Sequence, residues 1–273
     1  MTPPTSQPQA SVAQPGQAQR LRMSYEEYLA WADEDVHAEW VNGEVIVQMP
    51  PKLRHQNVVG FLLSLLKVFA QLSQLGTVLC APFEMRATPD GPAREPDLLF
   101  VAREHLERLT EARLSGPADL VVEVISDDSV SRDRADKFYE YQSAGVQEYW
   151  IIDPRPGYER VDFYVLDDKG RYRPIPVDAD GCYRSTVVPG FWFEVAWVLS
   201  EEPPNVLQAL SQIVGPEKVL AQGIQPGQSA GTGEGWSRIS WVGPGTAFGV
   251  SKYCNQCESM SREHNSDCPT RML

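Results

Sequence analysis

The alternation of apolar and polar positions along the chain predicts both helices and strands. From Leu53 to Leu75 apolar residues recur three or four positions apart, which predicts a long amphipathic helix that Gly76 ends. Shorter apolar runs predict buried strands at Glu95–Val101, Asp119–Ser126 and Glu148–Asp153. These elements together favour an α/β protein with a mixed sheet and flanking helices.

Local signals add further elements around this core. Ser24 and Glu27 have the spacing of a capping box, which predicts a short helix after Met23. Asn42-Gly43 predicts a hairpin turn within Ala38–Met49. The pattern also predicts strands at Thr77–Arg86, Arg160–Leu166, Arg171–Val177 and Tyr183–Val188, a last strand ending near Leu199, and helices at Arg132–Ala144 and Asn205–Ile213.

The distribution of these elements suggests three segments. Residues 1–22, rich in Pro, Gln, Ala and Ser, are expected to be a disordered leader without the features of a secretory signal. Residues 23–213 carry the periodic patterns and form one domain, whose C-terminal part is an antiparallel extension. Residues 214–273, in which Gly, Ser, Gln and Pro dominate, are expected to be a tail of low order.

The net charge of the chain bears on whether it binds nucleic acid. The chain of 273 residues has a net charge of -13, and residues 214–273 contribute none of it because they hold five basic and five acidic residues. This acidity disfavours tight non-specific binding to nucleic acid. It is compatible with a phosphodiester substrate if metal ions supply the local positive charge. No apolar run is long enough for a membrane span, so no membrane partner is expected.

The five cysteines do not suggest a disulfide framework, and we expect a cytoplasmic protein. Four potential zinc ligands occur in the tail, namely Cys254, Cys257, His264 and Cys268. Their spacing matches no established zinc motif, and little apolar sequence surrounds them. A zinc site there is therefore not expected, and reduced thiols in an extension are the alternative.

Two acids and a lysine stand out as candidate catalytic residues. Glu123 lies within an apolar strand, where an ionised carboxylate is costly unless it is paired or bound to metal. Asp97 opens the preceding buried strand, and Lys137 lies on the following helix. Two acids at the ends of neighbouring strands could hold Mg²⁺ or Mn²⁺, and Lys137 could orient water or stabilise the pentavalent phosphorus.

Several motifs around these residues resemble the Uma2 family, which belongs to the restriction endonuclease-like, PD-(D/E)xK superfamily. They are Glu39-Trp40-Val41-Asn42-Gly43-Glu44, Arg94-Glu95-Pro96-Asp97, Asp119 to Ser126, Asp136-Lys137 and Ala144 to Asp153. The resemblance covers roughly residues 23–213. It implies a restriction endonuclease-like core with a mixed sheet and a metal-dependent nuclease site.

Within this resemblance, Asp97 and Glu123 match the two motif acids. Ile125 stands where the lysine of (D/E)xK would lie, so the resemblance points to Lys137 as the displaced lysine. Glu39 and His55 also match family positions near the site. Glu39 is expected either as an additional metal ligand or as a residue that binds the ligand's water.

Structural explanations compete with these roles. Glu123 could form a buried ion pair with Arg132 or Lys137, and Lys137 could pair with Asp133 in a solvated contact between helix positions i and i+4. His55 could be a helix cap or a surface residue. Arg132 and Arg134 are the best candidates for phosphate contacts.

We therefore expect a Mg²⁺- or Mn²⁺-dependent endonuclease that acts on nucleic acid, with DNA as the expected substrate. One rival is a non-catalytic interaction module on the same fold, since fold does not determine function. The other is a hydrolase of smaller phosphate esters, which the acidic surface favours. A homodimer would suit a cutter of duplexes, but no sequence feature indicates one.

Overall fold

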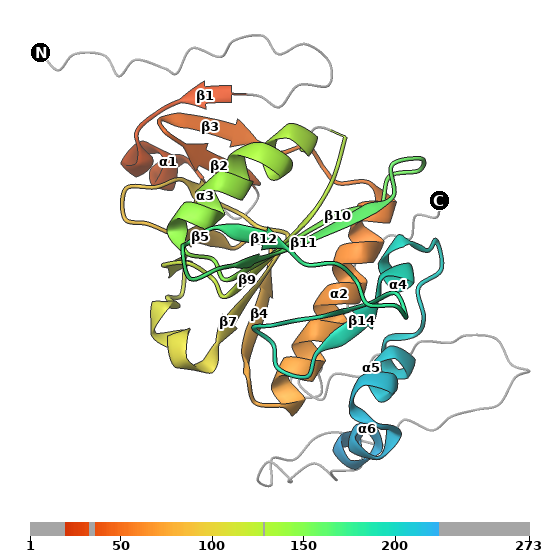
Figure 1. The fold of residues 1–273 in the computed structure, drawn as a ribbon. Helices are drawn as coiled ribbons and strands as arrows, with labels where there is room; N and C mark the ends of the chain where they lie inside the picture. The colour runs from red at the N-terminus through yellow and green to blue at the C-terminus, as the bar shows by residue number, and fades with distance from the viewer. Residues whose placement is uncertain (1–19, 33–35, 128, 224–273) are drawn as a thin grey trace, which may run out of the picture. The chain divides into compact units, whose positions relative to one another are not determined.

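A six-stranded mixed sheet lies at the centre of the computed structural model, which describes residues 20–32, 36–127 and 129–223. These residues all fall within one compact unit, Met1–Gln225. Strands β9 and β10 are parallel, and the other neighbours are antiparallel (Figure 1). The strand order is β12 (Tyr172–Pro174), β11 (Arg160–Leu166), β10 (Glu148–Asp153), β9 (Leu120–Val124), β7 (Leu98–Ala102) and β4 (Gly76–Cys80).

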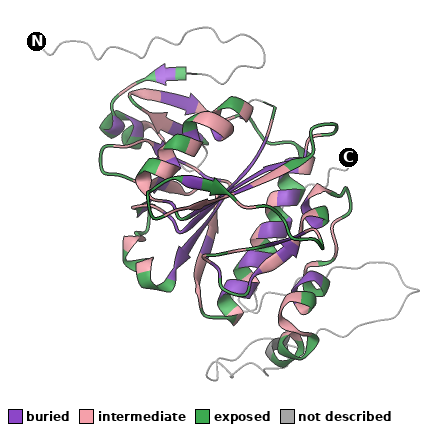
Figure 2. Ribbon diagram, in the orientation of Figure 1, coloured by how far each residue is buried: buried purple, intermediate pink, exposed green. Residues whose placement is uncertain are grey.

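The two faces of this sheet are covered by different helices, because alternate residues of a strand point to opposite faces. In β9, Val122 and Val124 pack in the core that contains the long helix α2 (Leu53–Leu72). Val121 packs on the other side, with Tyr141 of helix α3 (Lys137–Ala144). The strands β7, β9 and β10 are buried along their whole length (Figure 2). Glu123 therefore lies on the face that α3 covers.

A second six-stranded sheet places the N-terminal hairpin beside the central sheet. Its strand order is β1 (Arg20–Arg22), β3 (Glu44–Val47), β2 (Ala38–Val41), β6 (Ala93–Arg94), β5 (Glu84–Arg86) and β8 (Arg113–Ser115). Asn42 and Gly43 both have positive φ, 50° and 86°, as a tight two-residue hairpin requires. Helix α1 (Tyr25–Trp31) begins at the predicted capping box of Ser24 and Glu27 and packs against this sheet. Strand β2 thereby presents Glu39 to the interior.

One buried acid of the central sheet accepts several hydrogen bonds from the C-terminal extension. Glu148, at the start of β10, accepts hydrogen bonds from Trp150 Nε1, Tyr183 Oη, and the backbone N–H and hydroxyl of Thr186. The extension comprises the hairpin β13 (Cys182–Arg184) and β14 (Trp192–Glu194), and then the helices α4 (Val195–Leu199), α5 (Val206–Val214) and α6 (Pro216–Gly223). Residues of α4 and α5 complete the core on the α2 face.

Several element boundaries differ from those that the pattern predicted. The strand expected at Thr77–Arg86 is divided between the two sheets as β4 and β5, because Pro82 has no N–H to donate to a sheet and interrupts the run. Helix α2 ends at Leu72, and Gln74 rather than Gly76 adopts the left-handed conformation, with φ 54°. The last expected strand ends at Glu194, and Val195–Leu199 is helical because its apolar side chains pack beside α2.

Two described elements lie in segments that we expected to be low in order. Strand β1 falls in the expected leader, where Leu21 packs into the hairpin core, and α6 falls in the expected tail, where Val219 packs on the central core. The rest of those two segments, residues 1–19 and 224–273, lies outside the described residues. Within the part of the chain that is described, none of the helices has the length and apolarity of a membrane span.

Candidate active site

Asp97 and Glu123 come together across the antiparallel strands β7 and β9. Leu98 pairs with Val122, so the next positions on the two chains, Asp97 and Glu123, oppose each other. Asp97 Oδ2 accepts a hydrogen bond of 2.7 Å from the backbone N–H of Val124, the residue after Glu123. The structure thus places the two acids predicted from the sequence next to each other.

Glu123 is fully enclosed and bonded to helix α3. Its Oε1 atom accepts hydrogen bonds from Lys137 Nζ at 2.9 Å and from Tyr141 Oη at 2.8 Å. Only 2% of Glu123 and 2% of Lys137 are exposed. The structure therefore brings Lys137 to the paired acids, and it also contains the buried ion pair that the structural explanation for Glu123 requires.

The helix that carries Lys137 begins irregularly. Residues Arg132–Asp136 form a π-helical turn, η2, which leads directly into α3. Turns of this kind are rare and recur at functional sites. Asp133, Lys137 and Tyr141 are four positions apart, so all three side chains lie on the face toward β9. The contact between Lys137 and Asp133, at 3.4 Å, is buried rather than solvated.

Glu39 of β2 also contacts the ammonium group of Lys137. Glu39 Oε1 lies 3.0 Å from Lys137 Nζ, and Oε2 accepts a hydrogen bond of 2.9 Å from Arg94. Arg132 Nε is 3.8 Å from Oε2. Burial alone would raise the pKa of Glu39, but Lys137, Arg94 and Arg132 outweigh it and lower that pKa to about 2.

This environment shows what Glu39 contacts in the folded protein. Both oxygens of Glu39 are engaged by cations, and Oε1 also accepts from the backbone N–H of Glu95 at 3.3 Å. These contacts fix the positions of Lys137 and Arg94. A role for Glu39 as a metal ligand or in binding the ligand's water stays a prediction.

Glu123 has the opposite electrostatic environment. Burial raises its pKa to about 8, and the negative charges of Asp133, Asp97 and Glu39 add to this although Lys137 opposes it. Burial would lower the pKa of Lys137, but Glu123, Glu39 and Asp133 raise it, so the ammonium form persists. The three acids therefore favour a positive charge on Lys137.

His55 is next to Asp97, as the motif pattern suggested. Its Nε2 atom is 3.3 Å from Asp97 Oδ1. Burial would lower the pKa of His55, but the hydrogen bond and charge of Asp97 raise it. His55 is buried and belongs to the first turn of α2, so it is neither a surface residue nor the N-cap, which is Lys52.

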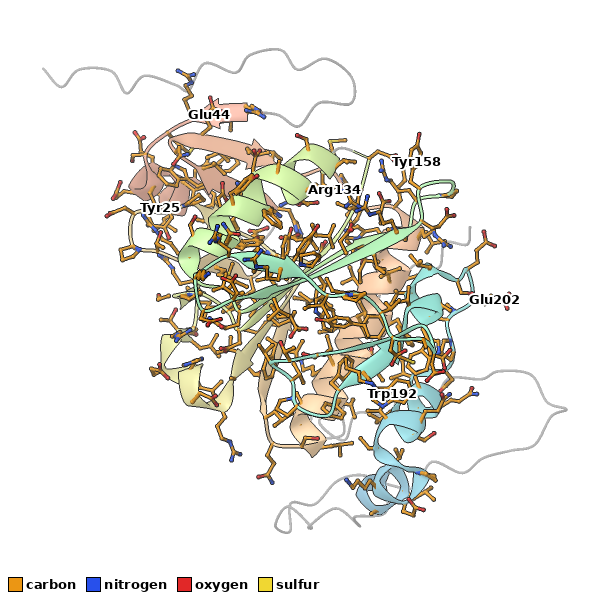
Figure 3. The ribbon with its side chains drawn as sticks, viewed as in Figure 1. Tyr25, Glu44, Arg134, Tyr158, Trp192 and Glu202 are labelled. Atoms are coloured by element: carbon orange, nitrogen blue, oxygen red, sulfur yellow. The ribbon has the colours of Figure 1, made fainter. Side chains whose placement is uncertain are left out.

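The two arginines expected at the phosphate are separated by the structure. Arg132 faces Glu39 and Asp133, at 3.8 Å and 3.9 Å. Arg134 instead pairs with Asp162 of β11 and lies 3.8 Å from Asp153 of β10 (Figure 3). Arg134 is therefore bound to acids outside the cluster, and only Arg132 lies beside the candidate site.

Three residues of the cluster received no catalytic role from the sequence. Arg94 joins Glu39 to Glu140 of α3 with two further hydrogen bonds of 2.8 Å and 2.7 Å. Tyr141 binds Glu123, and Asp133 Oδ1 is buried without a hydrogen bond. The four-residue spacing of Asp133, Lys137 and Tyr141 was a usable signal, whereas nothing local marked Arg94 as a partner of Glu39.

The donor set suits a hard divalent cation that retains water. Among the described residues, no group of three or more His, Cys, Asp or Glu side chains is arranged to hold a metal by itself. Mg²⁺ needs no such group, because it commonly takes one or two carboxylates together with waters and substrate phosphate. Asp97 and Glu123 fit that requirement. The candidate zinc ligands Cys254, Cys257, His264 and Cys268 lie outside the described residues.

Comparisons with known proteins agree with this fold. The family model named Uma2, described as a putative restriction endonuclease, matches residues 25–196. A solved structure of a putative nuclease of the DUF820 family, from Anabaena variabilis, is similar with a TM-score of 0.52 and 13% sequence identity. The match covers 65% of this chain and 97% of that one. A search of curated proteins found no match. Because the family model spans more than half of the sequence, the chain belongs to the Uma2 family.

Proposed function

We propose that the protein is a nuclease that hydrolyses phosphodiester bonds of nucleic acid, with DNA as its substrate and Mg²⁺ or Mn²⁺ as its cofactor. One observation carries the proposal. Asp97 and Glu123 oppose each other across two buried strands, and Lys137 contacts Glu123 at 2.9 Å. Metal-assisted phosphodiester hydrolysis requires hard oxygen ligands for the cation and, close to them, positive charge for the phosphate.

Asp97 and Glu123 would hold the metal, which when bound supplies a Lewis acid for the scissile phosphate and lowers the pKa of water. Lys137 holds positive charge where negative charge develops on the phosphate. Tyr141 orients Glu123 through its hydroxyl, and the Val124 N–H orients Asp97. Glu39 holds the Lys137 ammonium in place. A cytoplasmic location and a homodimer remain part of this proposal.

A plasmid-nicking assay with Mg²⁺ or Mn²⁺ tests the activity. Wild type is expected to convert supercoiled plasmid to open circles, and Asp97→Ala and Glu123→Gln are expected to lose this activity. Glu107→Gln is the matched control, because Glu107 has a side chain 69% exposed and lies away from the cluster. Equal nicking by wild type and Asp97→Ala would overturn the proposal.

One observation favours the rival, a non-catalytic module on the same fold. Lys137 is within ion-pair distance of three acids, Glu39, Glu123 and Asp133, which is also the arrangement of a structural network. Titration calorimetry with Mn²⁺ separates the two. Binding that Asp97→Ala abolishes supports the nuclease, and absence of binding to wild type supports the module.

A further inference from the structure

We propose that four residues next to the candidate site form a binding rim for single-stranded nucleic acid, with Tyr158 as a stacking platform for an unpaired base. The binding rim comprises Lys52, Asp127, Arg155 and Tyr158. This inference rests on the proposed function, because it names the form of substrate that the same site would receive.

Tyr158 is displayed at the turn between β10 and β11 (Figure 3). It is 67% exposed, and the guanidinium of Arg155 lies over its ring at 4.9 Å from the centroid. The Tyr158 N–H donates to the carbonyl of Arg155 at 2.9 Å, which closes the turn. The ring is therefore supported on one face by a cation, while its large exposed fraction leaves surface for a base.

Contacts connect this turn to the edge where Asp97 and Glu123 lie. Strands β9 and β10 are parallel, so the loops after them emerge at the same edge. Arg155, after β10, bonds Asp153 at 2.9 Å and lies 3.7 Å from Asp127, which follows β9. Asp127 in turn pairs with Lys52 at 2.5 Å.

The start of helix α2 completes this connection. Lys52 is the N-cap of α2, and Arg54 donates to the carbonyl of Pro154 in the β10–β11 turn. His55, in the first turn of the helix, contacts Asp97 at 3.3 Å. The binding rim and the catalytic acid Asp97 are thus attached to the same turn of one helix.

Lys52 of the binding rim can exchange its ion-pair partner, Asp127, for a phosphate of the nucleic acid. The side chain of Lys52 is 80% exposed and that of Asp127 is 60% exposed. Ion pairs between such exposed groups contribute little to stability, so a phosphate oxygen can replace Asp127 at small cost. Because the chain has a net charge of -13, binding requires local cations of this kind.

Stacking selects the single-stranded form. Bases within a duplex are already stacked on their neighbours, whereas an unpaired base offers its π-face to an aromatic side chain. An exposed tyrosine on a turn beside a cleavage site therefore favours a strand that is unpaired at that point. Duplex DNA would contact the cations of the binding rim without using the ring.

Fluorescence anisotropy with a labelled single-stranded 12-mer and the corresponding duplex, in EDTA, tests this inference. Tyr158→Ala is expected to weaken single-strand binding about 10-fold and to leave duplex binding within about 2-fold, while Tyr158→Phe keeps wild-type affinity. Tyr139→Ala is the matched control, because Tyr139 is 65% exposed on α3. Lys52→Ala is expected to reduce the salt slope of binding by about 0.7, and the exposed Lys67 of the same helix serves as its control.

The inference would be overturned if Tyr158→Ala bound the single strand as wild type does, or if it lost as much affinity for the duplex as for the single strand. Absence of single-strand binding by wild type would also overturn it. The assay needs no metal and no cleavage, so it is independent of the nicking test. Binding that depends on Tyr158 in a protein without nicking activity would overturn only the proposed hydrolysis. Nicking that persists without such binding would overturn only the binding rim.

Discussion

The Lys137 ammonium and the Glu123 carboxyl are buried in contact with each other, with Nζ and Oε1 separated by 2.9 Å. Nζ is also 3.0 Å from Glu39, and both acids influence its charge. The pKa values of the two acids shift in opposite directions, because Glu39 has three cationic neighbours whereas Glu123 has one cation and three acids around it. This difference makes the candidate site sensitive to pH and to substitution in ways that can be measured.

Glu123→Gln is expected to stabilise the metal-free protein increasingly as pH rises. The folded pKa of about 8 lies above the ordinary value of 4.5, so the native carboxyl retains a proton that the unfolded chain loses. Wild-type stability therefore falls between about pH 5 and pH 8, and glutamine removes that loss. Urea denaturation of both proteins at several pH values measures the difference. Destabilisation by Glu123→Gln at every pH would favour a purely structural ion pair.

Glu39→Gln is expected to destabilise the protein at neutral pH. The pKa of Glu39 falls from 4.5 to about 2 on folding, so its charge contributes stability above pH 4.5 that disappears as pH falls through about 2. This corresponds to about 3 kcal/mol at pH 7. Glu44→Gln is the control on the same hairpin, because its ion pairs with Arg20 and Arg22 are partly exposed and are worth about 1 kcal/mol at most. Equal effects from the two substitutions would contradict the assigned role.

Lys137→Met is expected to abolish metal-dependent nicking and also to destabilise the fold by about 3–5 kcal/mol, because it leaves buried acids without their shared cation. The effect on the fold is expected because Lys137 is only 2% exposed. Nicking is measured below the melting temperature of the variant. Lys67→Met, at an exposed position of α2, controls for the loss of a lysine charge. Wild-type nicking by Lys137→Met would show that another cation acts.

Tyr141→Phe is expected to move the pH dependence of nicking to higher pH. The Tyr141 hydroxyl donates a hydrogen bond of 2.8 Å to Glu123. Loss of this hydrogen bond disfavours the ionised carboxylate and raises the pKa of Glu123 further. The variant should recover activity at alkaline pH, which a merely damaged fold would not do. Tyr139→Phe, two residues away and exposed, should retain the wild-type profile. An unshifted profile for Tyr141→Phe would remove this tyrosine from the site.

Most core elements could be predicted from local pattern. The helix beginning at Leu53, the hairpin at Asn42-Gly43 and the strand Glu148–Asp153 are present in the structure. Two errors had different origins. The run Thr77–Arg86 is divided between two sheets at Pro82, which is a local signal against a continuous strand. Val195–Leu199 is helical beside α2 although its composition suits a strand, so there distant contacts outweighed local preference.

The sequence by itself was enough to select Asp97, Glu123 and Lys137 as candidates, because an acid in an apolar strand and a motif resemblance are both local properties. Tertiary structure alone decided which charges neutralise which. Arg94 reaches Glu39 across 55 positions, and Arg134 pairs with Asp162 instead of facing the site. The physical reason is that Coulomb energy depends on distance in space and on burial. The distances between these charges and their burial are set only when folding brings the two sheets and α3 around the cluster.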